Sequence, residues 1–133
     1  MKNILLDTNA ISYFLSGSKK LLKIFEKSDL VCISVISLGE LIYGFKSGSK
    51  ELLNKKTLNE KLTDPKIKIV KVTKTSAEIY SELKFKLRKL GTPIPDNDIW
   101  IAAQAIETDS ILITYDEHFL KVKGLKLWPR ILK

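Results

Sequence analysis

The chain has 133 residues, enough for one domain around one hydrophobic core. Hydrophobic residues make up 44% of it and charged residues 29%, which excludes a disordered chain, and no apolar run is long enough to cross a bilayer. Met1-Lys2-Asn3 leads directly into an apolar run instead of a signal peptide, so we expect a single cytoplasmic domain spanning residues 1–133.

Short apolar runs and amphipathic segments alternate through the first half of the chain. The run Ile4-Leu5-Leu6 has no polar break, which is typical of a strand buried on both faces of a parallel sheet. A second strand is predicted at residues 30–34. The spacing of apolar residues predicts helices at residues 8–15, 19–27, 37–48 and 49–62.

The same alternation continues in the second half. Residues 67–72 alternate apolar side chains with lysine, which indicates a strand near a sheet edge. Thr75-Ser76-Ala77-Glu78 matches a capping box and opens a helix that Gly91 ends. Asp96 or Asn97 is then expected to cap a helix that reaches Glu107. Two further strands are predicted at residues 111–113 and 125–128, the last ended by Pro129.

This order of elements predicts the class of fold. Strands that are apolar throughout, each separated from the next by a helix, are typical of an α/β protein. We therefore expect a three-layer sandwich with a central, mainly parallel sheet and helices on both of its faces.

Four acids occupy corresponding places in this pattern. Asp7 and Asp116 each follow an apolar strand, Glu40 lies one turn into the helix after the second strand, and Asp98 lies in the first turn of its helix. Strand ends and helix starts of a parallel sheet share one edge, so the four carboxylates are expected to converge. Carboxylates that close together repel, and a divalent cation removes that cost. An all-oxygen site suits Mg²⁺ or Mn²⁺ better than zinc.

Each acid also has an ordinary structural explanation. Asp7 is a favoured residue for capping the next helix, and Glu40 lies three residues after Ser37, as in a capping box. Asp98 suits the positive end of its helix, and Asp116 suits a turn. These explanations do not account for the presence of all four acids at one end of the sheet.

The charge of the chain points to the class of substrate. The formal net charge is +8, and it is +12 without the four acids. A basic surface around a cation-filled acidic site suits a phosphate-rich polymer, although lysine is also a common solvated surface residue. A cation held there can activate water and polarise a phosphodiester without a side-chain nucleophile. The single histidine, His118, has no Cys or Ser partner pattern and is expected near the surface or behind the ligands.

Taken together, these residues resemble the PIN-domain ribonucleases. The resemblance is carried by Asp7-Thr8-Asn9, by Glu40 within residues 33–41, by residues 93–103 around Asp98, by residues 114–119 and by the Leu125-x-x-Trp128 ending. Within that family the chain is most similar to the VapC toxins of bacterial and archaeal toxin–antitoxin pairs. The match covers essentially the whole chain, and its motifs occur in the family's order.

The resemblance implies a parallel sheet in the order 3-2-1-4-5 and cleavage of RNA that depends on Mg²⁺ or Mn²⁺. By position it implies that Asp7, Glu40, Asp98 and Asp116 are the catalytic, metal-holding quartet, with Asp7 and Asp98 as the most direct ligands. It further implies a homodimer and a VapB-type antitoxin whose tail occupies the cleft. Two more residues have roles by the same resemblance, which implies that Asn9 orients the first acid and that Thr114 supports the fourth.

Other readings of the residues stay open at this point. Tyr115 adjoins Asp116 and is a candidate for stacking on an RNA base. A PIN-like module that binds RNA or protein without cutting is an alternative, although such a module has no need of mutually repelling acids. A phosphatase with Asp7 as nucleophile is a weaker one, because the lysine and the paired acid that such a route needs are not evident.

Overall fold

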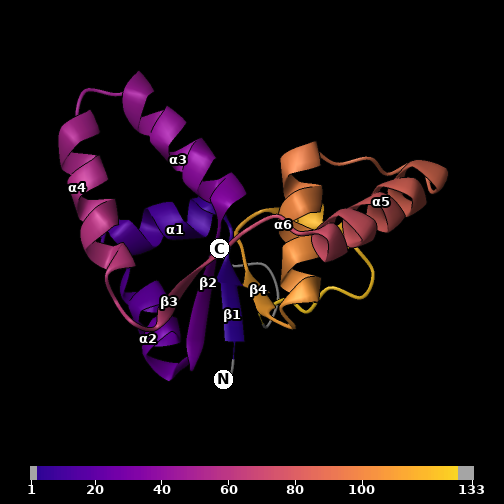
Figure 1. Ribbon diagram of the computed structural model, residues 1–133, viewed down its shortest axis with the longest axis horizontal. Coiled ribbons are helices and arrows are strands. Elements are labelled where there is room, and N and C mark those ends of the chain that lie inside the picture. Colours follow the sequence, from indigo (N-terminus) through magenta and orange to yellow (C-terminus); the bar gives the residue numbers. More distant parts are fainter. Residues whose placement is uncertain (1–2, 129–133) are drawn as a thin grey trace.

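The structure is a computed structural model that describes residues 3–128 (Figure 1). Within that range, four parallel strands form one sheet in the order β3-β2-β1-β4. They are β1 (Asn3–Leu6), β2 (Leu30–Ser34), β3 (Ile67–Val70) and β4 (Ile111–Ile113). The helices are α1 (Thr8–Leu15), α2 (Lys19–Lys27), α3 (Val35–Ser47), α4 (Glu51–Leu62), α5 (Lys74–Lys89), α6 (Asp96–Glu107) and the 3₁₀ helix η1 (Glu117–Lys121).

The predicted order is right for these four strands, but the fifth strand is wrong. Residues 125–128 pair with β4 through a single bridge, between Leu112 and Leu127. The Leu112 N–H donates to the Lys126 carbonyl and the Trp128 N–H donates to the Leu112 carbonyl, at 2.8 and 3.2 Å. β4 pairs over all three of its residues with β1 on its other side, but within the described residues its pairing with 125–128 stops at this bridge. The predicted end at Pro129 lies outside the described residues.

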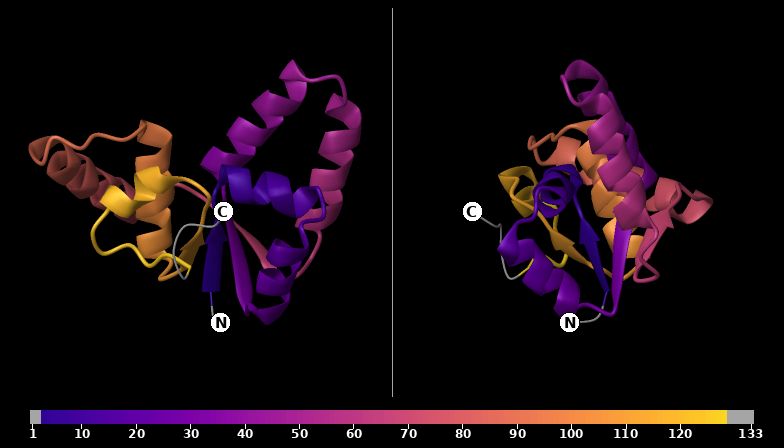
Figure 2. Two further views of the ribbon diagram at one scale, coloured as in Figure 1. Left: turned by 180° about the vertical axis from the view of Figure 1, so that it is seen from behind. Right: turned by 90° about the vertical axis from the view of Figure 1, so that its left-hand side faces the viewer.

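Helices cover both faces of the sheet, as predicted. Figures 1 and 2 show α1 to α4 on one side of the sheet and α5 and α6 on the other. Alternate residues of β1 explain the two layers, because Ile4 and Leu6 pack with α1 and α2 whereas Leu5 packs with α5 and α6. All three side chains are buried, which explains why the sequence of this strand is apolar without a break.

Three predicted helix starts are wrong by a few residues. Ser34 caps α3 and accepts a hydrogen bond from the Ile36 N–H, so that helix begins at Val35 rather than Ser37. The capping box of α5 joins Thr73 and Ser76 instead of Thr75 and Glu78. In α6 the cap position falls to Pro95, because the Asp96 carboxylate bonds to Tyr80 and Lys84 on α5 instead of to its own helix.

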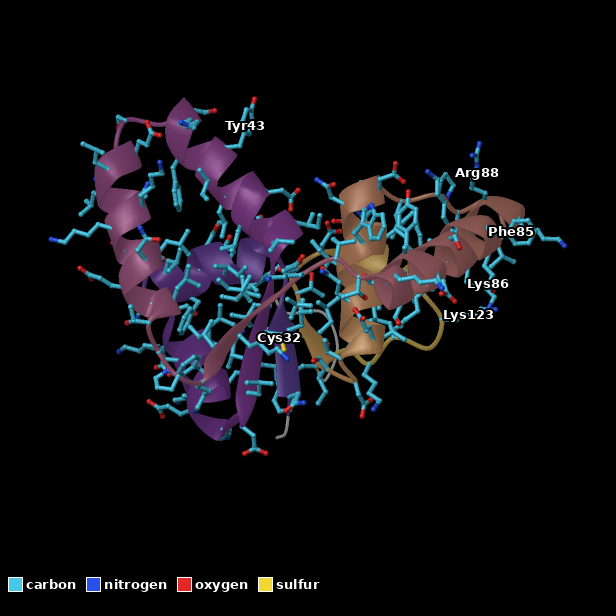
Figure 3. The ribbon with its side chains drawn as sticks, in the orientation of Figure 1. Cys32, Tyr43, Phe85, Lys86, Arg88 and Lys123 are labelled. Atoms are coloured by element: carbon cyan, nitrogen blue, oxygen red, sulfur yellow. The ribbon has the colours of Figure 1, made fainter. Side chains whose placement is uncertain are left out.

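Both helical groups carry exposed aromatic side chains. Figure 3 shows Tyr43 at the far end of α3, and Lys86 and Arg88 pointing outward from α5 with Lys123 close by. Phe85, on the same outer part of α5, is also exposed.

In the part of the chain described here, no helix is both long and apolar enough to pass through a membrane.

A buried glutamine fixes α6 against the sheet and so positions Asp98. Gln104 accepts a hydrogen bond from the Ser34 hydroxyl and donates one to the Val70 carbonyl, at 3.3 Å. We expect Gln104→Leu to lower the free energy of unfolding by about 2–4 kcal/mol, because two buried groups lose their partner. Urea denaturation measures this, and a loss below about 0.5 kcal/mol would show that these groups find other partners.

Candidate active site

The four predicted acids lie where the strands end and the helices begin. Asp7 follows β1 and caps α1, and Asp116 follows β4 and caps η1. Asp98 lies in the first turn of α6, and Glu40 in the second turn of α3. The capping explanation for Asp7 therefore holds locally, and Asp116, which was expected in a turn, caps η1. These capping hydrogen bonds do not use the whole carboxylate of either residue, because each oxygen has more than one lone pair.

Asp7 is the most buried of the four, with 4% of its surface exposed. Its Oδ1 accepts a hydrogen bond from the Ala10 N–H at 2.9 Å, and its Oδ2 accepts one from the Thr114 hydroxyl. Burial raises the pKa of Asp7 from 3.8 to about 6, and the charges of Asp98 and Asp116 add to the increase, against the two hydrogen bonds. Asp7 thus carries a negative charge that the protein itself stabilises poorly.

Asp98 is half-buried beside Asp116 and His118. Burial raises its pKa, the charges of Asp116 and Glu40 raise it further, and the contact with His118 opposes them. The Nδ1 atom of His118 lies 3.2 Å from Asp98 Oδ2 and 3.2 Å from Asp116 Oδ1. The one histidine of the chain therefore sits between two of the predicted acids.

Glu40 is held by two polar side chains from other elements. Its Oε1 accepts a hydrogen bond from the Thr8 hydroxyl, and its Oε2 accepts one from the Asn97 amide at 3.2 Å. Ser37 does not cap α3; its hydroxyl lies 3.1 Å from that of Thr8. The capping-box explanation for Glu40 is therefore wrong, and Glu40 faces the N-terminal ends of α1 and α6.

The residues that were expected to support the acids or to contact RNA lie in different surroundings. Thr114, expected beside Asp116, donates its hydroxyl hydrogen to Asp7 and accepts a hydrogen bond from the Asp116 N–H at 2.9 Å, so it serves two acids. Asn9 is exposed in the first turn of α1. Tyr115 is partly buried, and its ring packs against that of Tyr13 with the centroids 4.7 Å apart.

His118 lies near the surface beside Asp98 and Asp116, which agrees with the expectation, whereas sequence reasoning missed the supporting roles of Thr8 and Asn97. Thr8 and Asn97 adjoin Asp7 and Asp98 along the chain, which is the only signal that the sequence offers for them. Among residues 3–128, the atoms that gather most closely as possible cation ligands belong to Asp98, Asp116 and His118 and lie within 4.8 Å of one another.

Comparison with known families agrees with this arrangement. The PIN domain matches residues 4–125, which is nearly all of the chain. The chain belongs to the PIN-domain family. Ribonuclease VapC1 of Haemophilus influenzae is 30% identical to this PIN domain over 129 residues, covering 92% of this chain and 93% of the relative. Ribonuclease VapC2 of Rickettsia felis is 29% identical over 128 residues, covering 92% and 94%.

Solved structures show the same fold. The complex VapBC2 from Rickettsia felis, bound to a promoter DNA fragment, contains a chain that matches this PIN domain with a TM-score of 0.84 and 26% identity over 96% of this chain and 97% of that chain. A DNA-bound VapBC from Salmonella typhimurium matches with a TM-score of 0.86 over the same shares of the two chains. At 22% identity, the second likeness concerns the fold alone.

The residues of this PIN domain fit a divalent cation. Asp7, Asp98 and Asp116 present carboxylate oxygens at one edge of the sheet, and the pKa of Asp7 and that of Asp98 are raised by burial and by neighbouring negative charge. A positive ion would relieve both effects. Carboxylate oxygens are the ligands that Mg²⁺ and Mn²⁺ prefer, so the donor set agrees with the electrostatics.

Proposed function

We propose that this PIN-domain protein is a metal-dependent endoribonuclease and the toxin of a toxin–antitoxin pair. The observation that carries the proposal is that ligand atoms of Asp98, Asp116 and His118 lie within 4.8 Å of one another, at the sheet edge where Asp7 follows β1, in a chain that matches the family over residues 4–125. The names of the relatives, Ribonuclease VapC1 and VapC2, support the activity. Mg²⁺ or Mn²⁺ bound by these acids would supply a Lewis acid and lower the pKa of bound water.

The chain's own residues prepare the site in three ways. Thr114 and the Ala10 N–H fix both oxygens of Asp7, so its carboxylate is already oriented when a ligand arrives. Thr8 and Asn97 do the same for Glu40. With a pKa of about 6, Asp7 is mostly ionised at neutral pH and available to hold a cation. We infer that Asp7 and Asp98 are the most direct ligands of the cation, and that Asp116 and Glu40 complete the set of metal-holding acids.

The partners follow from the charge and from the relatives. The net charge of +8 and the exposed Lys86 and Arg88 on α5, with Lys123 close by, suit a polyanion such as RNA. The similar solved structure from Rickettsia felis is a VapBC complex, which supports a VapB-type antitoxin as protein partner. A homodimer of this chain is part of the same proposal. We also propose a cytoplasmic location, because the RNA substrate is found there.

Chelation tests the metal requirement. We expect EDTA to reduce cleavage of total bacterial RNA by about 100-fold or more, because the acids of the site cannot activate water or stabilise the charge on the phosphodiester without the cation. Excess Mg²⁺ or Mn²⁺ should restore the activity, and circular dichroism in EDTA shows that the fold survives. Undiminished cleavage in EDTA would refute the metal requirement. Binding of RNA without cleavage at any metal concentration would favour the non-catalytic module instead.

A further inference from the structure

His118 lies in contact with two of the acids. Its Nδ1 atom is equally close to Asp98 Oδ2 and Asp116 Oδ1, at 3.2 Å from each. The backbone around it is fixed, since the His118 N–H donates to Asp116 Oδ1 at 2.8 Å and the next residue, Phe119, is 1% exposed. The imidazole is therefore aimed at two acids by a short anchored helix.

One hydrogen cannot serve both contacts fully. A ring nitrogen carries at most one hydrogen, so Nδ1 can make a strong hydrogen bond to one carboxylate oxygen and only a shared one to both. If Nδ1 carries no hydrogen, three lone-pair atoms face one another. A cation among them would satisfy all three, and neighbouring ligand atoms around a small octahedral cation lie about 3 Å apart, close to the separation seen here.

We propose that His118 is a metal ligand, and that with Asp98 and Asp116 it makes a mixed nitrogen and oxygen site that favours Mn²⁺ over Mg²⁺. Imidazole nitrogen suits transition metals, whereas Mg²⁺ is held mainly by oxygen. The inference rests on the proposed metal-dependent function and adds a ligand and a metal preference to it. It departs from the expectation from the sequence, which placed His118 near the surface or behind the ligands.

The competing account is that His118 only holds Asp98 by a hydrogen bond. His118→Asn separates the two, because the asparagine amide can donate to Asp98 but has no imidazole nitrogen. Glu117→Gln is the matched control, since Glu117 is the exposed neighbour in the same turn and its loss of charge also alters the local field. Both variants keep Phe119 and thus the anchor of η1.

The experiment measures metal binding rather than cleavage. Pulsed electron paramagnetic resonance on the full chain loaded with Mn²⁺ should show a nitrogen coupling in wild type and in Glu117→Gln and none in His118→Asn. Isothermal titration calorimetry should show Mn²⁺ affinity falling about tenfold or more in His118→Asn, with a change in Mg²⁺ affinity below about threefold. Glu117→Gln should stay within about threefold of wild type for both ions.

Three results would overturn the inference. One is Mn²⁺ bound to wild type without nitrogen coupling, and another is a coupling that persists in His118→Asn. The third is equal loss of Mg²⁺ and Mn²⁺ affinity in His118→Asn, which would mark a positioning role. None of these results contradicts the proposed function as long as cleavage by the wild type stays sensitive to EDTA. If wild type binds neither ion and cleaves RNA in EDTA, the proposed metal dependence fails as well.

Discussion

Asp98→Asn is expected to lower the rate of RNA cleavage by about 1,000-fold or more while the protein stays folded. Asp98 lies among Asp116, Glu40 and His118, and its pKa is raised by burial and by the first two. The amide has nearly the same shape but no negative charge, so it relieves the repulsion and weakens the hold on a cation. A loss of activity without a loss of stability is the result that this geometry implies.

Asp96→Asn is the matched control for that substitution. Asp96 lies in the same turn of α6, but its carboxylate is exposed and bonds to Lys84 and Tyr80 on α5. We expect cleavage of total bacterial RNA by Asp96→Asn to stay within about threefold of wild type, with thermal unfolding followed for both variants. If the two substitutions inactivated the protein equally, cleavage would depend on the total negative charge at the start of α6 and not on the position of Asp98.

Asp7→Asn is expected to stabilise the metal-free protein at neutral pH while it abolishes cleavage. The pKa of Asp7 is about 6 in the folded chain and near 3.8 when exposed, so the folded state binds this proton more tightly. The stability that Asp7 contributes is therefore present at low pH and is lost as the pH rises from about 4 through 6. At pH 7.5 the cost of its charge is up to about 3 kcal/mol.

The asparagine can keep one hydrogen bond of the aspartate and replace the other with a bond of reversed direction. Its amide oxygen can accept from the Ala10 N–H, and its amide nitrogen can donate to the Thr114 hydroxyl. Urea denaturation in EDTA between pH 4 and pH 8 measures the effect, which should be largest at the upper end and vanish near pH 4. A variant less stable than wild type at pH 7.5 would contradict the raised pKa, and a gain independent of pH would point to packing instead.

Both expectations describe a site whose function works against its stability. Two of the acids have a raised pKa because burial and like charge surround them. Hydrogen bonds from Thr114 and from Ala10 offset part of that cost for Asp7 and leave the rest to a bound cation. The same residues that make the site costly without a metal make it attractive to one.

The sequence by itself determined the class of fold and the edge of the sheet on which the acids lie, and its resemblance to the PIN-domain family implied the order of the four strands. Ile4-Leu5-Leu6 and residues 111–113 are apolar without a break, and only strands covered on both faces bury such runs. The position of an acid directly after such a strand then follows from the chain direction. The failed fifth strand shows the limit, because apolar residues at 125–128 do not determine how many of them pair with β4.

Only the tertiary structure decided which side chains meet around the acids. Thr114 reaches Asp7 across 107 positions of sequence, and Asn97 reaches Glu40 across 57. His118 meets Asp98 across 20. These contacts depend on how α1, α3, α6 and η1 are oriented against one another, and that orientation is set by packing over the whole core rather than by the residues near each acid. For this reason periodicity located the carboxylates, whereas the hydroxyl, amide and imidazole groups that hold them became visible only in three dimensions.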